Sequence, residues 1–167
     1  KEYVRRCFKA SVMDFDDLLL KTNEILKKSP EALRKYQEKF KYILVDEYQD
    51  TNYSQYLIVK ALADRHENLC VVGDDSQSIY SFRGANIDNI LNFKKHYPDS
   101  KSYKLEQNYR STKNIVQAAN SLINHNKLKL DKTIWTDNDT GDKILLNKSL
   151  SDSEEGRYVS SNIFELK

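Results

Sequence analysis

The sequence predicts an α/β fold in which a mostly parallel sheet is flanked by helices. Short apolar segments alternate along the chain with longer segments of helical periodicity, which is the pattern of strands joined by helical crossovers. Polar and acidic residues follow these apolar segments directly, at the strand ends where such sheets bind ligands. No internal repeat is visible. These observations favour a ligand-binding α/β protein.

The chain begins with helical patterns. The first predicted helix is Asp14–Leu26, which contains FDDLLLKTNEIL. Ser29 and Pro30 then interrupt the pattern and start a second helix through EALRKYQEKF, with Ser29 as the N-cap and Pro30 in the first helical position.

Two strand candidates follow, separated by a helix. Tyr42–Val45 is a short continuous apolar run, typical of a strand that is buried on both faces of a parallel sheet. The helix Tyr53–Arg65 presents an apolar face, and the second strand, Leu69–Val72, comes after it. We expect both strands to belong to the mostly parallel sheet.

The rest of the chain continues the alternation. Ser111 or Thr112 is expected to cap a helix. The predicted elements are, in order, a helix at Asn86–His96, a third strand at Lys101–Leu105, a helix at Asn114–Asn124, a loop at Thr136–Asp142, a strand at Ile144–Asn147 and a helix from about Ser153.

Composition narrows the class of protein only a little. Lys and Arg number 27 against 25 Asp and Glu, a net charge of +2, which is too balanced to predict nucleic-acid binding from charge alone. Cys7 and Cys70 lie far apart and have no metal-binding spacing, so we expect reduced thiols. Without a signal peptide or an apolar run of membrane length, the sequence predicts a cytoplasmic protein with no membrane partner. Because it begins with Lys1 rather than Met, we expect an excerpt of a longer chain.

The first segment whose residues could bind a ligand or take part in catalysis is YILVDEYQDTN, in which an apolar strand ends in Asp46 and Glu47. A carboxylate at such a strand end can hold Mg²⁺, usually through water. A second acid beside it can orient or deprotonate an attacking water. From these residues alone, a pair of solvated or helix-capping acids is an equal alternative.

The second segment is VVGDDSQSIYSFRGA, where a strand runs into a polar turn. Tyr80, Phe82 and Arg83 alternate aromatic and cationic side chains, a combination that can stack on single-stranded bases. The alternative is an aromatic pair packed in the core.

The third segment is LEQNYRST, which places Arg110 just before a predicted helix. A cation at a helix N-terminus is unfavourable with respect to the helix dipole unless an anion joins it, and a nucleotide phosphate is the natural candidate. The alternative is a surface arginine paired with Glu106.

Together, these three segments resemble motifs II, III and IV of the superfamily 1 UvrD/PcrA/Rep-type ATP-dependent DNA helicases. The resemblance extends over about Asp14 to Asn138, and FDDLL at Phe15–Leu19 is similar to an element upstream of motif II in that family. It implies a RecA-like (P-loop NTPase) fold, incomplete here. Residues 1–13 would end an inserted helical subdomain, residues 14–104 would form the C-terminal part of the first RecA-like domain, and residues 105–167 would begin the second.

The resemblance also implies a role for each matching residue. Asp46 would bind Mg²⁺, mainly through water as is usual at such sites, and Glu47 would be the catalytic carboxylate. Gln77 would sense the γ-phosphate of ATP and take part in catalysis. Tyr109 would stack on the adenine, and Arg110 would reach the γ-phosphate from the second domain and act in catalysis.

The DNA-binding residues follow in the same way. Tyr80 and Phe82 would contact the bases of single-stranded DNA. Many relatives have Trp where this chain has Phe82, so a weaker contact is expected, since stacking contributes about 1–3 kcal/mol per base. Arg83 can contact the DNA or brace the loop, and both roles stay open.

The implied function is part of an ATP-dependent 3′–5′ DNA helicase that acts on single-stranded and duplex DNA with ATP and Mg²⁺. The sequence contains no GxxxxGK[ST] segment to cradle the phosphates, so this chain alone is expected to be inactive. Two alternatives remain: the helicase subunit of a helicase-nuclease recombination complex, and a non-catalytic DNA-binding module.

Overall fold

The computed structural model describes residues 1–166, and these residues pack into two compact units. The first unit comprises Lys1–Tyr103 together with the short segment Leu128–Asp131, and the second comprises the remainder. Leu128–Asp131 joins the first unit because the backbone N–H of Leu130 donates to the buried carboxylate of Asp75, over 2.8 Å. Whether the two units correspond to the predicted domains stays a prediction.

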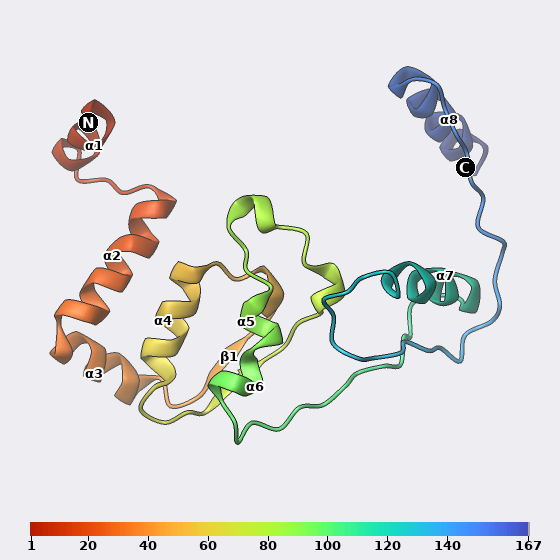
Figure 1. Ribbon diagram of the computed structural model, residues 1–167. Helices are drawn as coiled ribbons and strands as arrows, with labels where there is room; N and C mark the ends of the chain where they lie inside the picture. The colour runs from red at the N-terminus through yellow and green to blue at the C-terminus, as the bar shows by residue number, and fades with distance from the viewer. Residues whose placement is uncertain (167) are drawn as a thin grey trace. The chain divides into compact units, whose positions relative to one another are not determined.

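Helices α1 (Glu2–Lys9), α2 (Phe15–Lys28), α3 (Pro30–Lys39) and α4 (Tyr53–Ala63) form the helical part of the first unit, and Figure 1 shows α2, α3 and α4 as neighbours. The predicted helices at Asp14–Leu26, after Ser29, and at Tyr53–Arg65 are therefore confirmed. Local sequence explains their starts, because Asp14 and Asn52 form capping boxes and Ser29 caps α3 ahead of Pro30.

The sheet has two strands, β1 (Ile43–Val45) and β2 (Leu69–Val71), which pair in parallel with Ile43 opposite Leu69. Backbone hydrogen bonds continue past the strands, from Val72 N to Val45 O over 2.8 Å and from Tyr48 N to Val72 O over 2.9 Å. A small parallel sheet flanked by helices is thus confirmed. The extra bonds hold the two segments that leave the sheet next to each other.

Burial of the first strand on both faces was expected, and this prediction is wrong. Leu44, in the middle of β1, is 77% exposed, whereas Ile43 and Val45 on the opposite face are half-buried. Helix α4 contacts β1, and among residues 1–166 no element covers the side chain of Leu44.

After the sheet, the first unit consists of short helical turns. These are the 3-10 helices η1 (Tyr48–Asp50), η2 (Asp75–Gln77) and η3 (Ser81–Arg83), and the helices α5 (Asp88–Leu91) and α6 (Phe93–His96). The single helix expected at Asn86–His96 is therefore interrupted, because Asn92 ends one helix and starts the next. The third strand expected at Lys101–Leu105 is wrong, since this segment has no regular structure.

A buried tyrosine anchors these turns. The side chain of Tyr48 in η1 is 1% exposed, and its ring meets the ring of Phe93 in α6 edge to face, with 5.9 Å between centroids. Burial raises the pKa of the Tyr48 phenol to about 12. The first turn of the segment that leaves β1 is therefore fixed to the core.

The second unit contains α7 (Lys113–Ile123) and α8 (Asp152–Glu165), which confirms both predicted helices. Gln107 and Trp135 form an isolated parallel bridge, and 136–142 is a loop as expected. The strand expected at Ile144–Asn147 is wrong, because these residues pair with no strand among those described.

The N-terminus of α7 is capped differently from the prediction. Thr112 occupies the N-cap position, but its side chain makes no capping hydrogen bond. Instead, the carbonyls of Asp139 and Thr140 accept from the first two helical N–H groups, those of Lys113 and Asn114, over 3.0 and 3.2 Å. The loop folds back on the helix start, a contact that a local sequence pattern does not reveal.

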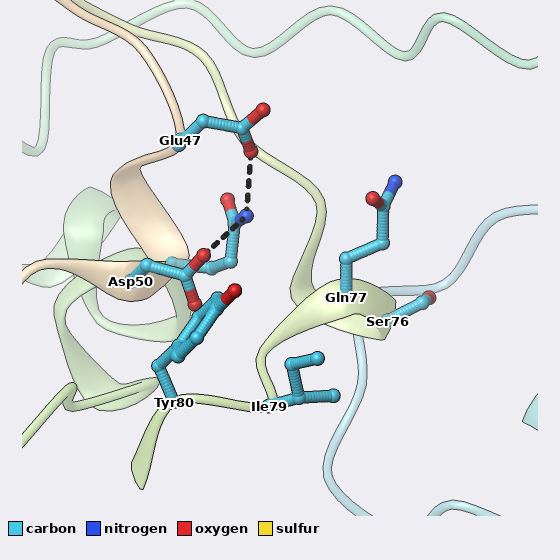
Figure 2. Close-up of a pocket in the computed structure, with 7 residues that line it drawn as sticks. Glu47, Asp50, Ser76, Gln77, Ile79 and Tyr80 are labelled. Atoms are coloured by element: carbon cyan, nitrogen blue, oxygen red, sulfur yellow. Dashed lines mark hydrogen bonds between the residues drawn. The ribbon is translucent and has the colours of Figure 1, made fainter. Parts of the chain in front are cut away.

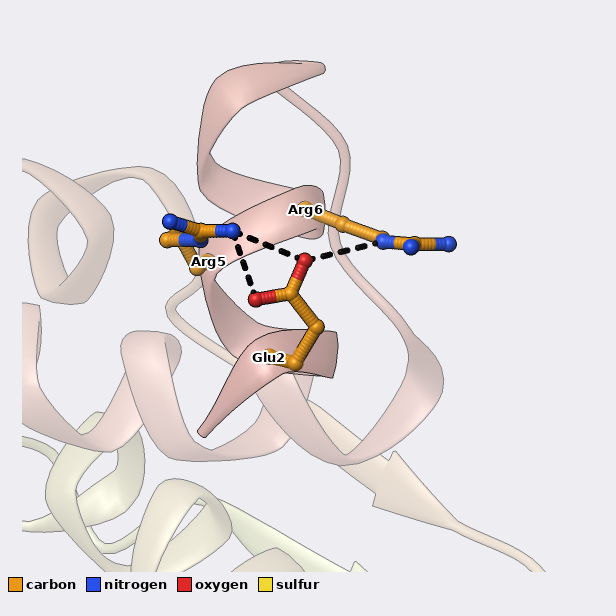
Figure 3. A network of polar contacts seen from close by, with 3 residues as sticks. All are labelled: Glu2, Arg5 and Arg6. Carbon is orange, nitrogen blue, oxygen red and sulfur yellow. Dashed lines mark hydrogen bonds and ion pairs between the residues drawn. The ribbon is translucent and has the colours of Figure 1, made fainter.

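Helix α1 buries no residue and carries two exposed ion pairs in its first turns. Glu2 accepts from Arg5 and Arg6, one turn further along the same exposed helix (Figure 3), with the shortest distance 2.7 Å. None of the helices within residues 1–166 combines the length and the apolar character that crossing a bilayer requires.

Candidate functional site

The candidate site lies where the two parallel strands end. Asp46 and Glu47 follow β1, and Gly73 and Asp74 follow β2. Because the strands run in parallel, both segments leave the sheet at the same edge, which is the usual ligand position in such folds. A hollow of about 570 Å³ opens there, and Figure 2 shows its lining, which includes Glu47 and Gln77.

The backbone at Glu47 adopts an unusual conformation. Its φ of 50° and ψ of 40° lie in the left-handed region, which costs a non-glycine residue on the order of 1–3 kcal/mol and is concentrated at functional sites. Two hydrogen bonds hold it there. The Glu47 N–H donates to Asp46 Oδ1, and Gln49 Nε2 donates to Glu47 Oε2, both over 2.8 Å. The Glu47 side chain is exposed at the hollow, with one carboxylate oxygen held.

Gln77 lines the same hollow from the second segment. Asp74 orients it, because Gln77 Nε2 donates to Asp74 Oδ2 over 2.8 Å. The other carboxylate oxygen of Asp74 accepts from Ser76 N over 3.0 Å and so starts η2. Glu47 and Gln77, which sequence analysis singled out separately, are thus brought to one hollow, and Tyr80 lines it as well.

A buried glutamine that the sequence analysis left without a role joins the two segments. Gln49 is 1% exposed, and its Oε1 accepts from Asp74 N over 3.0 Å while its backbone carbonyl accepts from the Ser78 hydroxyl over 3.3 Å. Gly73 makes this approach possible. A Cβ on Gly73 would stand 2.5 Å from Gln49 Oε1, closer than real contacts allow.

Thr51 and Asn89 form a second buried polar tie that the sequence did not reveal. Asn89 Nδ2 donates to both the carbonyl and the hydroxyl oxygen of Thr51, each over 3.0 Å, and Asn86 N also donates to the Thr51 carbonyl. Asn52 pairs with Ala85 in an isolated antiparallel bridge. The residues that follow the acidic pair therefore fix the far end of the second segment. The only sequence signal was a run of polar residues between an apolar strand and a helix.

Asp46 faces a second hollow, of about 440 Å³, on the other side of Glu47. Its side chain is exposed, and within residues 1–166 no group of three or more His, Cys, Asp or Glu side chains is arranged to hold a metal ion. A single exposed carboxylate suits Mg²⁺, which keeps most of its water and uses one or two protein ligands together with phosphates. The residues present fit such an ion at Asp46, and they do not form a closed metal cage.

The aromatic residues of the second segment are not packed in the core, so that alternative is wrong. Phe82 is 75% exposed, and its ring lies 5.9 Å from that of Tyr80. The guanidinium of Arg83 lies over both rings, 5.5 Å from the centroid of Tyr80 and 5.4 Å from that of Phe82. The two roles left open for Arg83, contacting the DNA or bracing the loop, both stay predictions. Gly84, at φ 82°, ends the turn that carries them.

Tyr109 and Arg110 lie in the second unit. Both side chains are exposed, and Asn108 shapes the turn by accepting from the backbone N–H groups of Arg110 and Ser111, over 2.9 and 2.7 Å. The alternative that Arg110 pairs with Glu106 is wrong. Glu106 accepts from Thr133 N instead, and within the described chain the Arg110 guanidinium has no hydrogen bond or ion pair.

Comparison with known families and proteins identifies relatives along the whole chain. Residues 1–98 match the UvrD/REP helicase N-terminal domain, and residues 103–167 match the UvrD-like helicase C-terminal domain. The chain is 51% identical over 166 residues to DNA helicase II of Rickettsia typhi. It is 50% identical over 165 residues to the ATP-dependent DNA helicase PcrA of Bacillus subtilis, and also to that of Staphylococcus epidermidis.

Each of these matches covers 99% of this chain but only 25%, 22% and 23% of the respective relative. The chain therefore spans about a quarter of the length of the curated relatives it matches.

Proposed function

The chain belongs to the UvrD/Rep helicase family, and from this membership we propose that it supplies part of the ATP-hydrolysing cleft of a longer ATP-dependent DNA helicase. Its two units would contribute to two RecA-like domains, with ATP bound between them. Hydrolysis would drive movement along single-stranded DNA and unwinding of the duplex. The 3′–5′ direction is carried over from the family resemblance alone.

One observation carries the proposal. Glu47 and Gln77 come from two different strand ends and line one hollow, and Asp46, next to Glu47 in the chain, lines a second hollow that Glu47 shares. A carboxylate that is exposed at a hollow and held by one oxygen can accept a proton from water. A neutral amide across the hollow can contact the phosphate that this water attacks.

Each residue of the first unit has a distinct task in this mechanism. Asp46 would hold Mg²⁺, mainly through water, and the ion would neutralise developing phosphate charge. Glu47 would orient the attacking water and take its proton. Gln77 would contact the γ-phosphate. Its amide is oriented by the hydrogen bond from its Nε2 to the Asp74 carboxylate.

The second unit would complete the cleft. The exposed ring of Tyr109 is available to stack on the adenine, and its hydroxyl donates to Gln107 Oε1 over 2.8 Å, which limits its motion. The unpaired guanidinium of Arg110 is available for the γ-phosphate. Tyr80 and Phe82 would hold bases while the cleft opens and closes, so that each cycle of hydrolysis advances the strand.

The test uses the full-length protein that carries this chain. Arg110→Ala is expected to lower kcat roughly 10³-fold or more, as loss of an arginine finger does, while nucleotide binding changes far less. Arg157→Ala, which removes an exposed arginine of α8, is the matched control and is expected to leave turnover unchanged. Equal losses of turnover and nucleotide binding in Arg110→Ala would contradict the finger role.

The isolated chain provides a second test. Without a GxxxxGK[ST] loop it is expected to show no ATP turnover, with or without single-stranded DNA. If the isolated chain hydrolysed ATP and Glu47→Gln abolished that activity, the phosphate loop would be dispensable and this expectation would be wrong.

A further inference from the structure

We propose that Gln49 is a positioning residue for hydrolysis, which orients the Glu47 carboxylate and couples it to Gln77 through Asp74. This inference rests on the proposed function, because it concerns the same site. It assigns a task to a side chain that touches neither the reacting water nor the phosphate.

Both ends of the Gln49 amide are used, and only one orientation satisfies them. Its Nε2 donates to Glu47 Oε2 over 2.8 Å, and its Oε1 accepts from the backbone N–H of Asp74 over 3.0 Å. If the amide were rotated by 180°, its NH₂ group would face the N–H of Asp74, donor against donor. Its oxygen would then face the Glu47 carboxylate, acceptor against acceptor. At 1% exposure, no solvent can compensate for such a mismatch, so the orientation is fixed.

Asp74 carries the connection onward to Gln77. Its backbone N–H is held by Gln49, and its carboxylate accepts from Gln77 Nε2 over 2.8 Å. The two residues proposed to contact the water and the γ-phosphate are thus joined by one continuous hydrogen-bonded path. A shift of either strand-end segment must alter the position of the other.

The path also accounts for the backbone of Glu47. The left-handed turn at this residue brings its carboxylate back over the chain, to the side chain two residues further on. Gln49 then holds Oε2, while Glu47 Oε1 has no hydrogen bond among the described residues. One oxygen is anchored and the other is available for water.

Glutamine is suited to this place by its charge. Asp50 Oδ2 lies 3.5 Å from Gln49 Nε2, so the amide stands between two carboxylates. A carboxylate in its place would repel both, and an asparagine would be one methylene shorter. A neutral amide donates toward the acids while accepting from a backbone N–H.

The test is Gln49→Met in the full-length protein, which keeps the length of the side chain and removes both hydrogen bonds. We expect kcat for ATP to fall roughly 10²-fold, the effect of misplacing a reacting group by about 1 Å, with little change in KM. Gln37→Met is the matched control. Gln37 is half-buried and ties α3 to Ala61 of α4 by a 2.8 Å hydrogen bond, so its loss lowers stability and leaves kcat unchanged.

Two further measurements separate positioning from folding. Gln49→Glu retains an acceptor for the Asp74 N–H but presents a carboxylate to Glu47, so folded Gln49→Glu protein is also expected to lose kcat. A double-mutant cycle with Glu47→Gln, measured in single turnover, should show that Gln49→Met has little further effect once Glu47 is gone.

The outcomes are distinct. Unchanged kcat in folded Gln49→Met or Gln49→Glu, or full additivity in the cycle, overturns the inference and leaves the proposed function standing. Absence of turnover by the unaltered full-length protein overturns the proposed function, and this inference with it.

Discussion

Substitution of Gly73 by alanine would add a single methyl group at the contact between the two strand-end segments and disrupt that contact. The added Cβ would stand 2.5 Å from Gln49 Oε1, 3.0 Å from Ile90 Cδ1 and 3.2 Å from Tyr48 N. Gln49 is fully buried and the third neighbour is backbone, so neither can move aside freely. Overpacking together with loss of the bond from Asp74 N to Gln49 is expected to destabilise the strand ends by about 2–4 kcal/mol.

The assay must follow the first unit alone. The only tryptophan of the chain, Trp135, belongs to the second unit, so its fluorescence does not report on the strand ends. Amide hydrogen exchange over residues 69–77 does. We expect loss of protection there in Gly73→Ala and an unchanged fluorescence transition.

Gly156→Ala is the matched control for this substitution. Gly156 lies inside α8, and a Cβ there would meet no atom within 4 Å. Alanine should therefore stabilise α8 by about 0.5–1 kcal/mol, the opposite sign for the same chemical change. Unchanged protection over residues 69–77 in Gly73→Ala would refute the claim that close approach to Gln49 requires glycine at this position.

Three further predictions concern neighbouring features. Arg83→Lys keeps the charge but loses the flat guanidinium over the rings of Tyr80 and Phe82, so single-stranded DNA should bind more weakly by about 0.5–1 kcal/mol in fluorescence anisotropy, with nucleotide binding unaltered. Asn89→Ala removes the buried amide that donates to the Thr51 hydroxyl and leaves the Thr51 carbonyl with Asn86 N alone, and it should cost about 1–3 kcal/mol in urea unfolding of the first unit; a smaller loss would show that this interaction is dispensable. Because burial raises the pKa of Tyr48 from 10.0 to about 12, its contribution to stability should be complete below pH 10 and disappear as the pH rises through about 12, which the pH dependence of unfolding, measured against Tyr48→Phe, checks.

The sequence predicted the elements whose causes are local. Capping residues such as Asp14 and Ser29 fixed helix starts, and the apolar runs before Asp46 and Gly73 marked the two strands that pair. The strand expected at Ile144–Asn147 had the same apolar character, yet Leu146 is 96% exposed. A strand needs a partner to hydrogen-bond and a surface to cover, and a short apolar run does not reveal whether the chain supplies either.

The chemistry at the candidate site was likewise more predictable than its supports. Glu47 could be singled out because paired acids after a strand have a recognisable use, and Gln77 because the family resemblance gives it a role; both line one hollow. Gln49 was passed over because its partner Asp74 lies 25 residues away in sequence and its burial has no local signature. The same holds for Thr51 and Asn89, 38 residues apart.

The electrostatics of the strand ends explain why these supports are neutral amides. Asp46, Glu47, Asp50 and Asp74 are crowded at one edge of the sheet, and a lysine or arginine packed among them would hold them together by neutralising them. It would also place a positive charge where Mg²⁺ is expected and compete with it for the same carboxylates. Gln49 contacts Glu47, Asp50 and the backbone of Asp74 without adding charge. Gln49 therefore ties the acidic segments together by hydrogen bonds without placing a competing positive charge beside the expected Mg²⁺.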